Sequence, residues 1–254
     1  PERGVPYTGL AVGFSSLRAD APGLEPLLRD VFAELAELTP GPYLHFGGDE
    51  ALGTSPEDYR RMVSLTARLI AETGKTPVAW HEAGIADLPP GSVGQYWDYR
   101  VPRDDHAERA RAFVANGGRL ILSPADAIYL DMKYDAHTPI GLTWADGATS
   151  VERSYEWEPS TLIPDVPESA ILGVEAPLWT ETVRTLADID LLMFPRVASA
   201  AEAGWSAAAG TPERTWESFR QRIAGLAGHW TVAGIGFHRA SDVPWTDDGR
   251  HLAE

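Results

Sequence analysis

Short apolar runs alternate with longer amphipathic segments along most of this chain. Each short run is bounded by Gly or Pro, which is typical of buried β-strands. The predicted strands are residues 43–46, 76–80, 92–96, 119–122 and 171–176. The amphipathic segments predict helices over residues 24–38, 56–72, 104–116, 186–194, 196–203 and 216–227.

The helix predicted over residues 56–72 shows the clearest helical period. Its apolar positions recur at a spacing near 3.6 residues, and they are Tyr59, Met62, Val63, Leu65, Leu69 and Ile70. Thr54 and Ser55 precede Pro56, and this combination is typical of a helix start. Gly117 and Gly118 mark the end of the next predicted helix.

Strands that alternate with helices predict a parallel sheet, either open or closed into a barrel. No Gly-x-Gly-x-x-Gly motif follows the first strand, which disfavours an open nucleotide-binding sheet. Candidate site residues follow every predicted strand, as in a (β/α)8 barrel. We expect residues 1–236 to be part of such a domain, with an active-site loop and no clear helix over 123–168. Residues 237–254 predict an irregular tail.

Composition narrows the possible partners. The 254 residues include 37 acids and 21 bases, a formal charge of −16, which argues against nucleic acid and anionic membranes as partners. There is no cysteine, so disulfides, thiolate metal sites and a cysteine nucleophile are excluded. No apolar run reaches the roughly 18 residues of a membrane span. Nine tryptophans suggest a stacking surface for sugar rings.

Asp49 and Glu50 follow the first predicted strand, in a loop loosened by Gly47 and Gly48. Two adjacent acids could simply lie at the start of a helix. A metal site is also conceivable, because histidine and carboxylate side chains bind zinc. Its ligands would be His45, Asp49, His81 and Glu82, but no ligand spacing supports it. We interpret His45 as a structural histidine, and His81 and Glu82 as supporting or rim residues.

The segment from His45 to Glu50 resembles the His-x-Gly-Gly-Asp-Glu signature of family 20 glycoside hydrolases, the β-N-acetylhexosaminidases. Further landmarks follow in the order that the family keeps: Pro77-Val78-Ala79-Trp80-His81-Glu82, Gln95-Tyr96-Trp97, Leu122-Ser123-Pro124 with Tyr129-Leu130-Asp131, and Glu175-Ala176-Pro177-Leu178-Trp179-Thr180-Glu181. The resemblance implies a (β/α)8 barrel of which this chain holds roughly strands four to eight. It implies no cofactor and no metal.

The resemblance also implies a reaction, namely exo-cleavage of terminal N-acetylglucosamine or N-acetylgalactosamine from oligosaccharides. Ordinary retaining glycosidases use two carboxyls about 5–5.5 Å apart, whereas Asp49 and Glu50 are chain neighbours. The family uses the substrate's own 2-acetamido oxygen as nucleophile. Glu50 would then be the general acid and base, with its pKa raised by burial and by Asp49. Asp49 would accept the acetamido N–H, and Tyr129 would donate to the acetamido carbonyl.

Further roles follow from the same resemblance. Trp80, Trp97 and Trp179 would enclose the sugar and its acetamido methyl group, and Trp144 would border the leaving group. Asp131 and Glu181 would bind the hydroxyls at C4 and C6. The other tryptophans, namely Trp157, Trp205, Trp216 and Trp230, are interpreted as packing residues, with Trp245 undecided.

Some expected residues have no counterpart here. The family's sugar-binding arginine, and the Asp and His that support its acid, match no motif in residues 1–39. We therefore expect sequence upstream, and a chain that is poorly stable or inactive without an upstream fragment that completes the barrel. An alternative is a carbohydrate-binding remnant without turnover. A chitinase-type barrel is a third possibility, but its Asp-x-x-Asp-x-Asp-x-Glu signature is absent. Export is plausible, but the compartment is left open.

Overall fold

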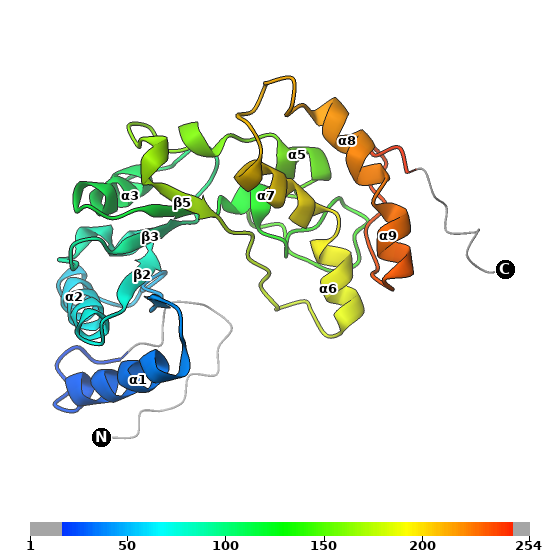
Figure 1. Cartoon of the computed structure of the whole chain (residues 1–254). Helices are drawn as coiled ribbons and strands as arrows, with labels where there is room; N and C mark the ends of the chain where they lie inside the picture. Colours follow the sequence, from blue (N-terminus) through cyan, green and yellow to red (C-terminus); the bar gives the residue numbers. More distant parts are fainter. Residues whose placement is uncertain (1–16, 246–254) are drawn as a thin grey trace. The chain divides into compact units, whose positions relative to one another are not determined.

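The computed structural model describes residues 17–245, in which strands and helices alternate as predicted (Figure 1). The strands are β1 (Tyr43–His45), β2 (Thr76–Trp80), β3 (Val93–Tyr96), β4 (Leu120–Leu122) and β5 (Ile171–Val174). The α-helices are α1 (Leu24–Leu38), α2 (Pro56–Glu72), α3 (His106–Ala115), α4 (Ala125–Ile128), α5 (Val151–Tyr155), α6 (Leu186–Met193), α7 (Arg196–Trp205), α8 (Trp216–Ala224) and α9 (Ala227–Val232). Short 3-10 helices are η1 (His81–Ile85), η2 (Pro159–Thr161) and η3 (Glu168–Ala170).

The chain divides into two compact units, which are described separately. Within the described residues, the first unit holds residues 17–96, together with Asp104–Ile121 and Asp165–Leu172. The second unit holds Trp97–Arg103, Leu122–Pro164 and residues 173–245.

The sheet has the strand order β1-β2-β3-β4-β5, so that chain neighbours are also spatial neighbours. The first three strands pair in parallel, with His45 opposite Val78 and Trp80 opposite Gln95. Parallel pairing places the carboxyl ends of β1 and β2 at one edge of the sheet. The loop that carries Asp49 and Glu50 therefore leaves the sheet beside the end of β2.

In the first unit, α1 and α2 pack over the sheet through apolar side chains. Leu28 and Phe32 of α1 meet Leu69 and Ile70 of α2, and all four are buried. Ser55 caps α2, since its Oγ accepts a hydrogen bond from the backbone N–H of Asp58 at 3.1 Å. This cap and Pro56 at the first helical position fix the start of α2 that the sequence predicts.

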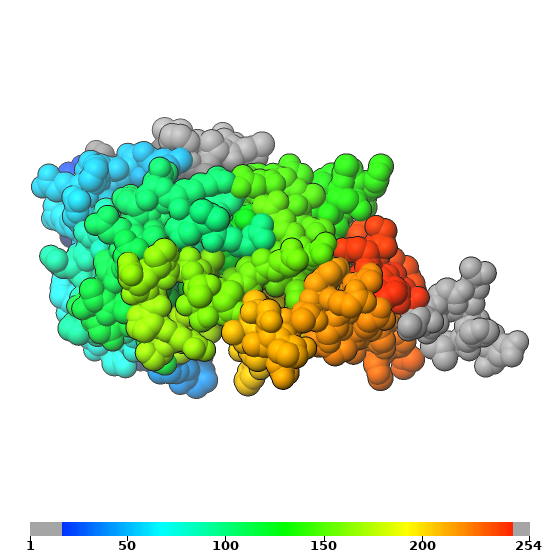
Figure 2. Space-filling model, turned by 90° about the horizontal axis from the view of Figure 1, so that it is seen from above, coloured from blue at the N-terminus to red at the C-terminus, as the bar shows by residue number. Residues whose placement is uncertain are grey.

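In the second unit, the largest cluster is aromatic. Tyr155 stacks on Phe219 with ring centroids 4.3 Å apart, and Trp230 contacts Phe237 and Trp245. The helices α8 and α9, which supply much of this cluster, lie in the orange part of the surface in the space-filling view, and the red part is the segment that follows them (Figure 2). Trp245, undecided from the sequence, is thus a packing residue.

Several sequence predictions need correction. Residues 123–168 contain the short helices α4 and α5 rather than loop alone. The sequence does not predict these two helices, because they are too short to show a helical period. The helix α9 follows α8 as a separate element. The prediction that Trp205 is a packing residue is wrong, since this residue is 92% exposed at the end of α7. Trp157 and Trp230 are buried, as predicted.

Residues 237–245 form neither helix nor strand, and residues 246–254 of the predicted tail lie outside the described part of the chain. Between residues 17 and 245, no helix has both the length and the hydrophobicity that crossing a bilayer requires.

Candidate active site

The turn after β1 carries the two candidate acids on an unusual backbone. Gly47 and Gly48 have φ values of +82° and +98°, and Glu50 has a φ of +45°. Glycine adopts such left-handed conformations without steric cost, whereas a glutamate does not. The glycines thus allow, between the strand and the carboxylates, a backbone conformation that other residues adopt only with strain.

The electrostatics of this turn favour a protonated Glu50. The pKa of Glu50 is raised above its usual range, first by partial burial and second by the charge of Asp49. A carboxyl with a raised pKa keeps its proton closer to neutral pH, as a general acid requires. Both side chains are exposed in this structure, so each is open to a ligand.

His45 and Trp80 support the start of the turn. The Nδ1 atom of His45 accepts a hydrogen bond from the N–H of Gly47 at 3.0 Å. The His45 ring also lies edge-on to Trp80, with centroids 5.1 Å apart. The backbone N–H of Trp80 donates to the Gly47 carbonyl at 3.0 Å. These contacts agree with the interpretation of His45 as a residue that orients its neighbours.

His81 and Glu82 lie in the interior of the first unit rather than on a rim. Both side chains are buried, and His81 Nε2 lies 2.5 Å from His106 Nδ1. Burial, and then the neighbouring His106, lowers the pKa of His81 to about 3, so the ring stays neutral. No group of three His, Cys, Asp or Glu residues within 17–245 could hold a metal ion, so the metal interpretation gains no support.

The second unit contains a group of aromatic rings that the sequence assigned to sugar binding. Trp144 lies edge-on to both Trp97 and Tyr129, at centroid distances of 6.2 Å and 5.8 Å. Tyr129 also contacts Trp179 at 6.1 Å. Trp144 and Trp179 are 45% and 40% exposed, whereas Tyr129 is buried. Half-exposed indoles beside a buried tyrosine are suited to stack on a sugar ring.

A backbone contact brings Trp144 to this group. The N–H of Leu142 donates to the Asp131 carbonyl at 2.8 Å, and the Leu142 carbonyl accepts from Lys133 at 2.8 Å. Gly141 permits this approach, because it has a φ of +100° and a Cβ atom there would lie 2.8 Å from the Asp131 oxygen. The strand-like pairing thus fixes the loop that ends in Trp144.

Asp131 is a buried carboxylate with only weak local compensation. Burial raises its pKa to about 6, and the nearby Glu181 adds to the effect, while backbone N–H groups of Asp131 and Trp179 partly oppose it. Within the described part of the chain, neither oxygen has a hydrogen bond of good geometry. A buried acceptor whose backbone donors are poorly aligned is suited to receive a ligand hydroxyl. Glu181, by contrast, is exposed.

Two supporting residues were not predicted. Arg196 is fully buried, and its Nη2 donates to the carbonyls of Leu130 and Met132 at 2.7 Å and 2.6 Å. Tyr59 donates from its hydroxyl to the Gly48 carbonyl at 2.5 Å. Hydrophobic periodicity counts Tyr59 as an apolar position of α2 and gives Arg196 no role, so neither hydrogen bond could be found from the pattern.

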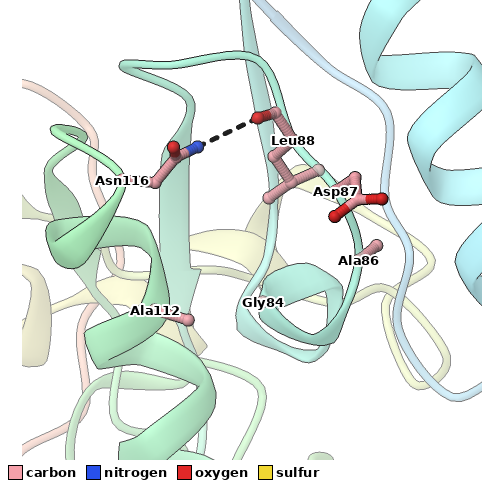
Figure 3. Close-up of a pocket in the computed structure, with 6 residues that line it drawn as sticks. All are labelled: Gly84, Ala86, Asp87, Leu88, Ala112 and Asn116. Carbon is pink, nitrogen blue, oxygen red and sulfur yellow. Dashed lines mark hydrogen bonds between the residues drawn. The ribbon is translucent and has the colours of Figure 1, made fainter.

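The first unit also contains a small hollow beside the loop that follows η1. It has a volume of about 170 Å³ and is lined by Gly84, Ala86, Asp87, Leu88, Ala112 and Asn116 (Figure 3). The side-chain amide of Asn116 donates to the Leu88 carbonyl at 3.0 Å and holds this loop. A Cβ atom on Gly84 would lie 2.1 Å from the Arg109 carbonyl oxygen, so close packing explains this glycine.

Residues 54–208 match the family model described as "Glycosyl hydrolase family 20, catalytic domain". The chain belongs to glycosyl hydrolase family 20. The expected resemblance is thereby confirmed, and so is the fold class, since the five-stranded parallel sheet is part of the family's barrel.

Several relatives of this family 20 chain are close in sequence. It is 42% identical over 243 residues to a β-N-acetylhexosaminidase of Cellulomonas fimi, which covers 96% of this chain and 47% of the relative. A solved family 20 β-N-acetylglucosaminidase is 57% identical, with a TM-score of 0.91, over 96% of this chain and 52% of its own.

A solved Streptomyces plicatus N-acetyl-β-hexosaminidase, in complex with Thio-NAglucal, is 45% identical with a TM-score of 0.89. That match covers 94% of this chain and 47% of the other. This family 20 chain therefore spans about half the length of the relatives it matches.

The predicted site residues fall into two groups, one in each unit. Asp49, Glu50 and Trp80 lie in the first unit, and the structure brings them together around the ends of β1 and β2. The second unit contains Trp97, Tyr129, Asp131, Trp144, Trp179 and Glu181. Their assembly around one substrate stays a prediction.

Proposed function

We propose that this chain carries the acid and the amino-sugar pocket of an exo-acting, retaining β-N-acetylhexosaminidase. The substrates would be oligosaccharides that end in N-acetylglucosamine or N-acetylgalactosamine at the non-reducing end. Membership of family 20 supports this class of reaction. The observation that carries the proposal is the segment after β1, which places Asp49 and Glu50 side by side on the surface, where partial desolvation and then the charge of Asp49 raise the pKa of Glu50.

In the first step, Glu50 transfers its proton to the glycosidic oxygen, and the leaving alcohol departs. The oxygen of the substrate's own 2-acetamido group attacks the anomeric carbon from the opposite side and closes a cyclic oxazolinium ion. Asp49 accepts the acetamido N–H and stabilises the positive charge of this intermediate. Tyr129 donates to the acetamido oxygen and holds it in line for attack.

In the second step, the Glu50 carboxylate removes a proton from water, and the resulting nucleophile attacks the anomeric carbon. The ring opens, the acetamido group is restored and Glu50 regains its proton. Two inversions give net retention. Because one group acts first as acid and then as base, a pKa between that of an ordinary carboxyl and neutrality serves both steps.

The remaining residues would hold the sugar. Trp80, Trp97 and Trp179 would contact the acetamido methyl and the ring face, and Trp144 would border the leaving group. Asp131 and Glu181 would accept hydrogen bonds from the C4 and C6 hydroxyls. The buried, weakly compensated carboxylate of Asp131 supports this role, because a ligand hydroxyl would supply its missing donor.

The test compares two variants in a version of the protein that carries the upstream segment. Glu50→Gln should lower hydrolysis of an aryl N-acetylglucosaminide by about 10²–10⁴-fold and leave sugar binding intact. Glu57→Gln, an exposed acid in the first turn of α2, is the matched control and should leave the rate unchanged. An unaltered rate in Glu50→Gln would refute the acid assignment. Binding without turnover by the unmutated protein, with its upstream segment present, would favour the carbohydrate-binding alternative.

A complex with an N-acetylglucosamine thiazoline tests the pocket itself. This stable analogue of the cyclic intermediate should bind with its ring nitrogen at Asp49, its sulfur at Tyr129 and its methyl group among the indoles. An analogue bound elsewhere would remove the basis for the substrate-assisted mechanism.

We further propose that a polypeptide segment upstream of this one completes the barrel. The strand order places β1 at the end of the sheet, and a family 20 barrel closes on eight strands. The matched relatives are about twice as long. We expect the isolated chain to turn over an aryl N-acetylglucosaminide far more slowly than intact relatives, and addition of an upstream fragment to restore activity. Rates near those of intact relatives from the chain alone would refute this.

A further inference from the structure

The turn between β1 and the candidate acids must be held in a shape that it would not keep by itself. Gly47, Gly48 and Glu50 all have left-handed backbone conformations. Glycine can adopt more backbone conformations than any other residue. Two adjacent glycines therefore do not fix the orientation of the carboxylates that follow them. Contacts from outside the turn have to supply it.

Two hydrogen bonds from neighbouring elements reach the glycine carbonyls. The backbone N–H of Trp80, at the end of β2, donates to Gly47 at 3.0 Å. The hydroxyl of Tyr59, on α2, donates to Gly48 at 2.5 Å. The Gly48 carbonyl belongs to the peptide group that joins Gly48 to Asp49. A donor at this oxygen therefore sets the orientation of the peptide from which the two acids continue.

We propose that Tyr59 is a positioning residue, which holds the Asp49–Glu50 pair in its working orientation through the carbonyl of Gly48. The proposal rests on the proposed function of Glu50 as the acid. Tyr59 would touch neither substrate nor the reacting atoms.

The surroundings of Tyr59 suit a permanent donor. Burial, and then the charge of Glu82, raises the pKa of its phenol, so the hydroxyl keeps its proton at any working pH. The ring lies against an apolar hollow of about 240 Å³ with Phe46, Met62 and Val63 among its lining residues. Tyr59→Phe would keep this packing and remove only the hydrogen bond.

The first test uses this chain and needs no activity. The N–H of Leu52 donates to the Glu50 carbonyl at 2.8 Å and so reports on the turn. In Tyr59→Phe, hydrogen exchange of the Leu52 amide should accelerate by about tenfold, as loss of one hydrogen bond implies. Tyr43→Phe is the matched control: it removes the hydroxyl that accepts from Arg119 at the opposite end of β1, and it should not change this exchange.

The second test is kinetic and uses a version of the polypeptide that turns over substrate. Tyr59→Phe should lower kcat by about tenfold with KM within about twofold, because the acid is misplaced in the transition state while sugar contacts persist. The basic limb of the pH profile should move to lower pH by about half a unit, as Glu50 becomes more solvated and less close to Asp49. A merely structural role would lower the melting temperature and leave this limb in place.

The outcomes separate the two proposals. If Glu50→Gln abolishes turnover while Tyr59→Phe changes neither the Leu52 exchange nor the basic limb, the positioning role is overturned and the proposed function stands. If Glu50→Gln leaves the rate unaltered, the proposed function fails, and the positioning role, which rests on it, fails too. The expected result is loss of turnover in Glu50→Gln together with both shifts in Tyr59→Phe.

Discussion

Arg196 holds the backbone on both sides of Asp131, because its guanidinium donates to the carbonyl oxygens of the residues immediately before and after it. The same guanidinium lies 3.8 Å from the centre of the Tyr134 ring and is fully buried. Its charge lowers the pKa of Asp131, in opposition to burial. The arginine thus fixes both the position of this carboxylate and part of its electrostatic environment.

Asp131→Asn should stabilise the protein at neutral pH while weakening sugar binding. The pKa of Asp131 is about 6 in the folded chain, above the roughly 3.9 of an unfolded aspartate, so the protonated form favours folding. Stability is therefore lost as pH rises from about 4 to about 6, by up to about 3 kcal/mol. Urea unfolding should show Asp131→Asn more stable at pH 7 and equal to the unmutated chain near pH 3. Lower stability at pH 7 would contradict this.

Asp188→Asn is a control that should change the free energy of unfolding at neutral pH in the opposite direction. Backbone N–H donation from Arg184 and the contacts with Thr185 lower the pKa of Asp188, which closes the capping box of α6. This carboxylate stabilises the fold above its unfolded pKa, and the contribution disappears as pH falls. The variant should therefore lose stability at pH 7 and lose none near pH 3.

Gly141→Ala should disturb the Trp144 loop. The new Cβ atom would lie 2.8 Å from the Asp131 carbonyl oxygen on a backbone with a φ of +100°. Gly147→Ala is the matched control, because Gly147 has a φ of +92° but no heavy atom within 4 Å of the place that the new methyl group would take. We expect about 1 kcal/mol lost in the control and about 2–3 kcal/mol in Gly141→Ala, measured by urea unfolding. Equal losses would show that the clash relaxes freely.

Tyr129→Phe should reduce catalysis rather than stability. Removal of one donor that orients and stabilises the reacting acetamido group should lower kcat/KM by about a hundredfold. Tyr99→Phe serves as the comparison, because the Tyr99 hydroxyl donates to the Trp144 carbonyl over a long distance of 3.4 Å. Kinetics with an aryl N-acetylglucosaminide would test this, and equal effects of the two changes would exclude the assigned role of Tyr129.

Two tryptophans that look alike in sequence should respond differently to substitution. Trp205 is 92% exposed, whereas Trp230 is 8% exposed and packs among the aromatic side chains of the second unit. Trp230→Ala should cost about 3–5 kcal/mol, and Trp205→Ala should leave the free energy of unfolding unchanged within about 0.5 kcal/mol. Thermal and urea unfolding of both variants would distinguish these cases.

The long elements could be predicted because their patterns repeat. The boundaries of α1, α2 and β2 agree with the sequence prediction, since each carries a full apolar stripe or a cap. The short helices α4 and α5 could not be predicted, because so few residues show no period. Trp205 was misjudged for a different reason: residue type indicates a preference for burial, but the helix face that it occupies decides the outcome.

The candidate site shows the same contrast. Asp49, Glu50 and Tyr129 belong to motifs that resemble those of the family, so the sequence could name them as candidates. The contacts of Arg196 with carbonyls 64 and 66 residues away depend on tertiary packing. No local pattern records such a contact, and the role of Arg196 becomes visible only from the structure.

The left-handed backbone at Glu50 has a practical consequence for engineering. A glycine at this position would relieve about 1 kcal/mol of conformational strain. A selection for thermal tolerance alone would therefore reward the loss of the residue that we propose as the general acid. Directed evolution of this chain needs a screen that scores heat resistance and hydrolysis in the same well.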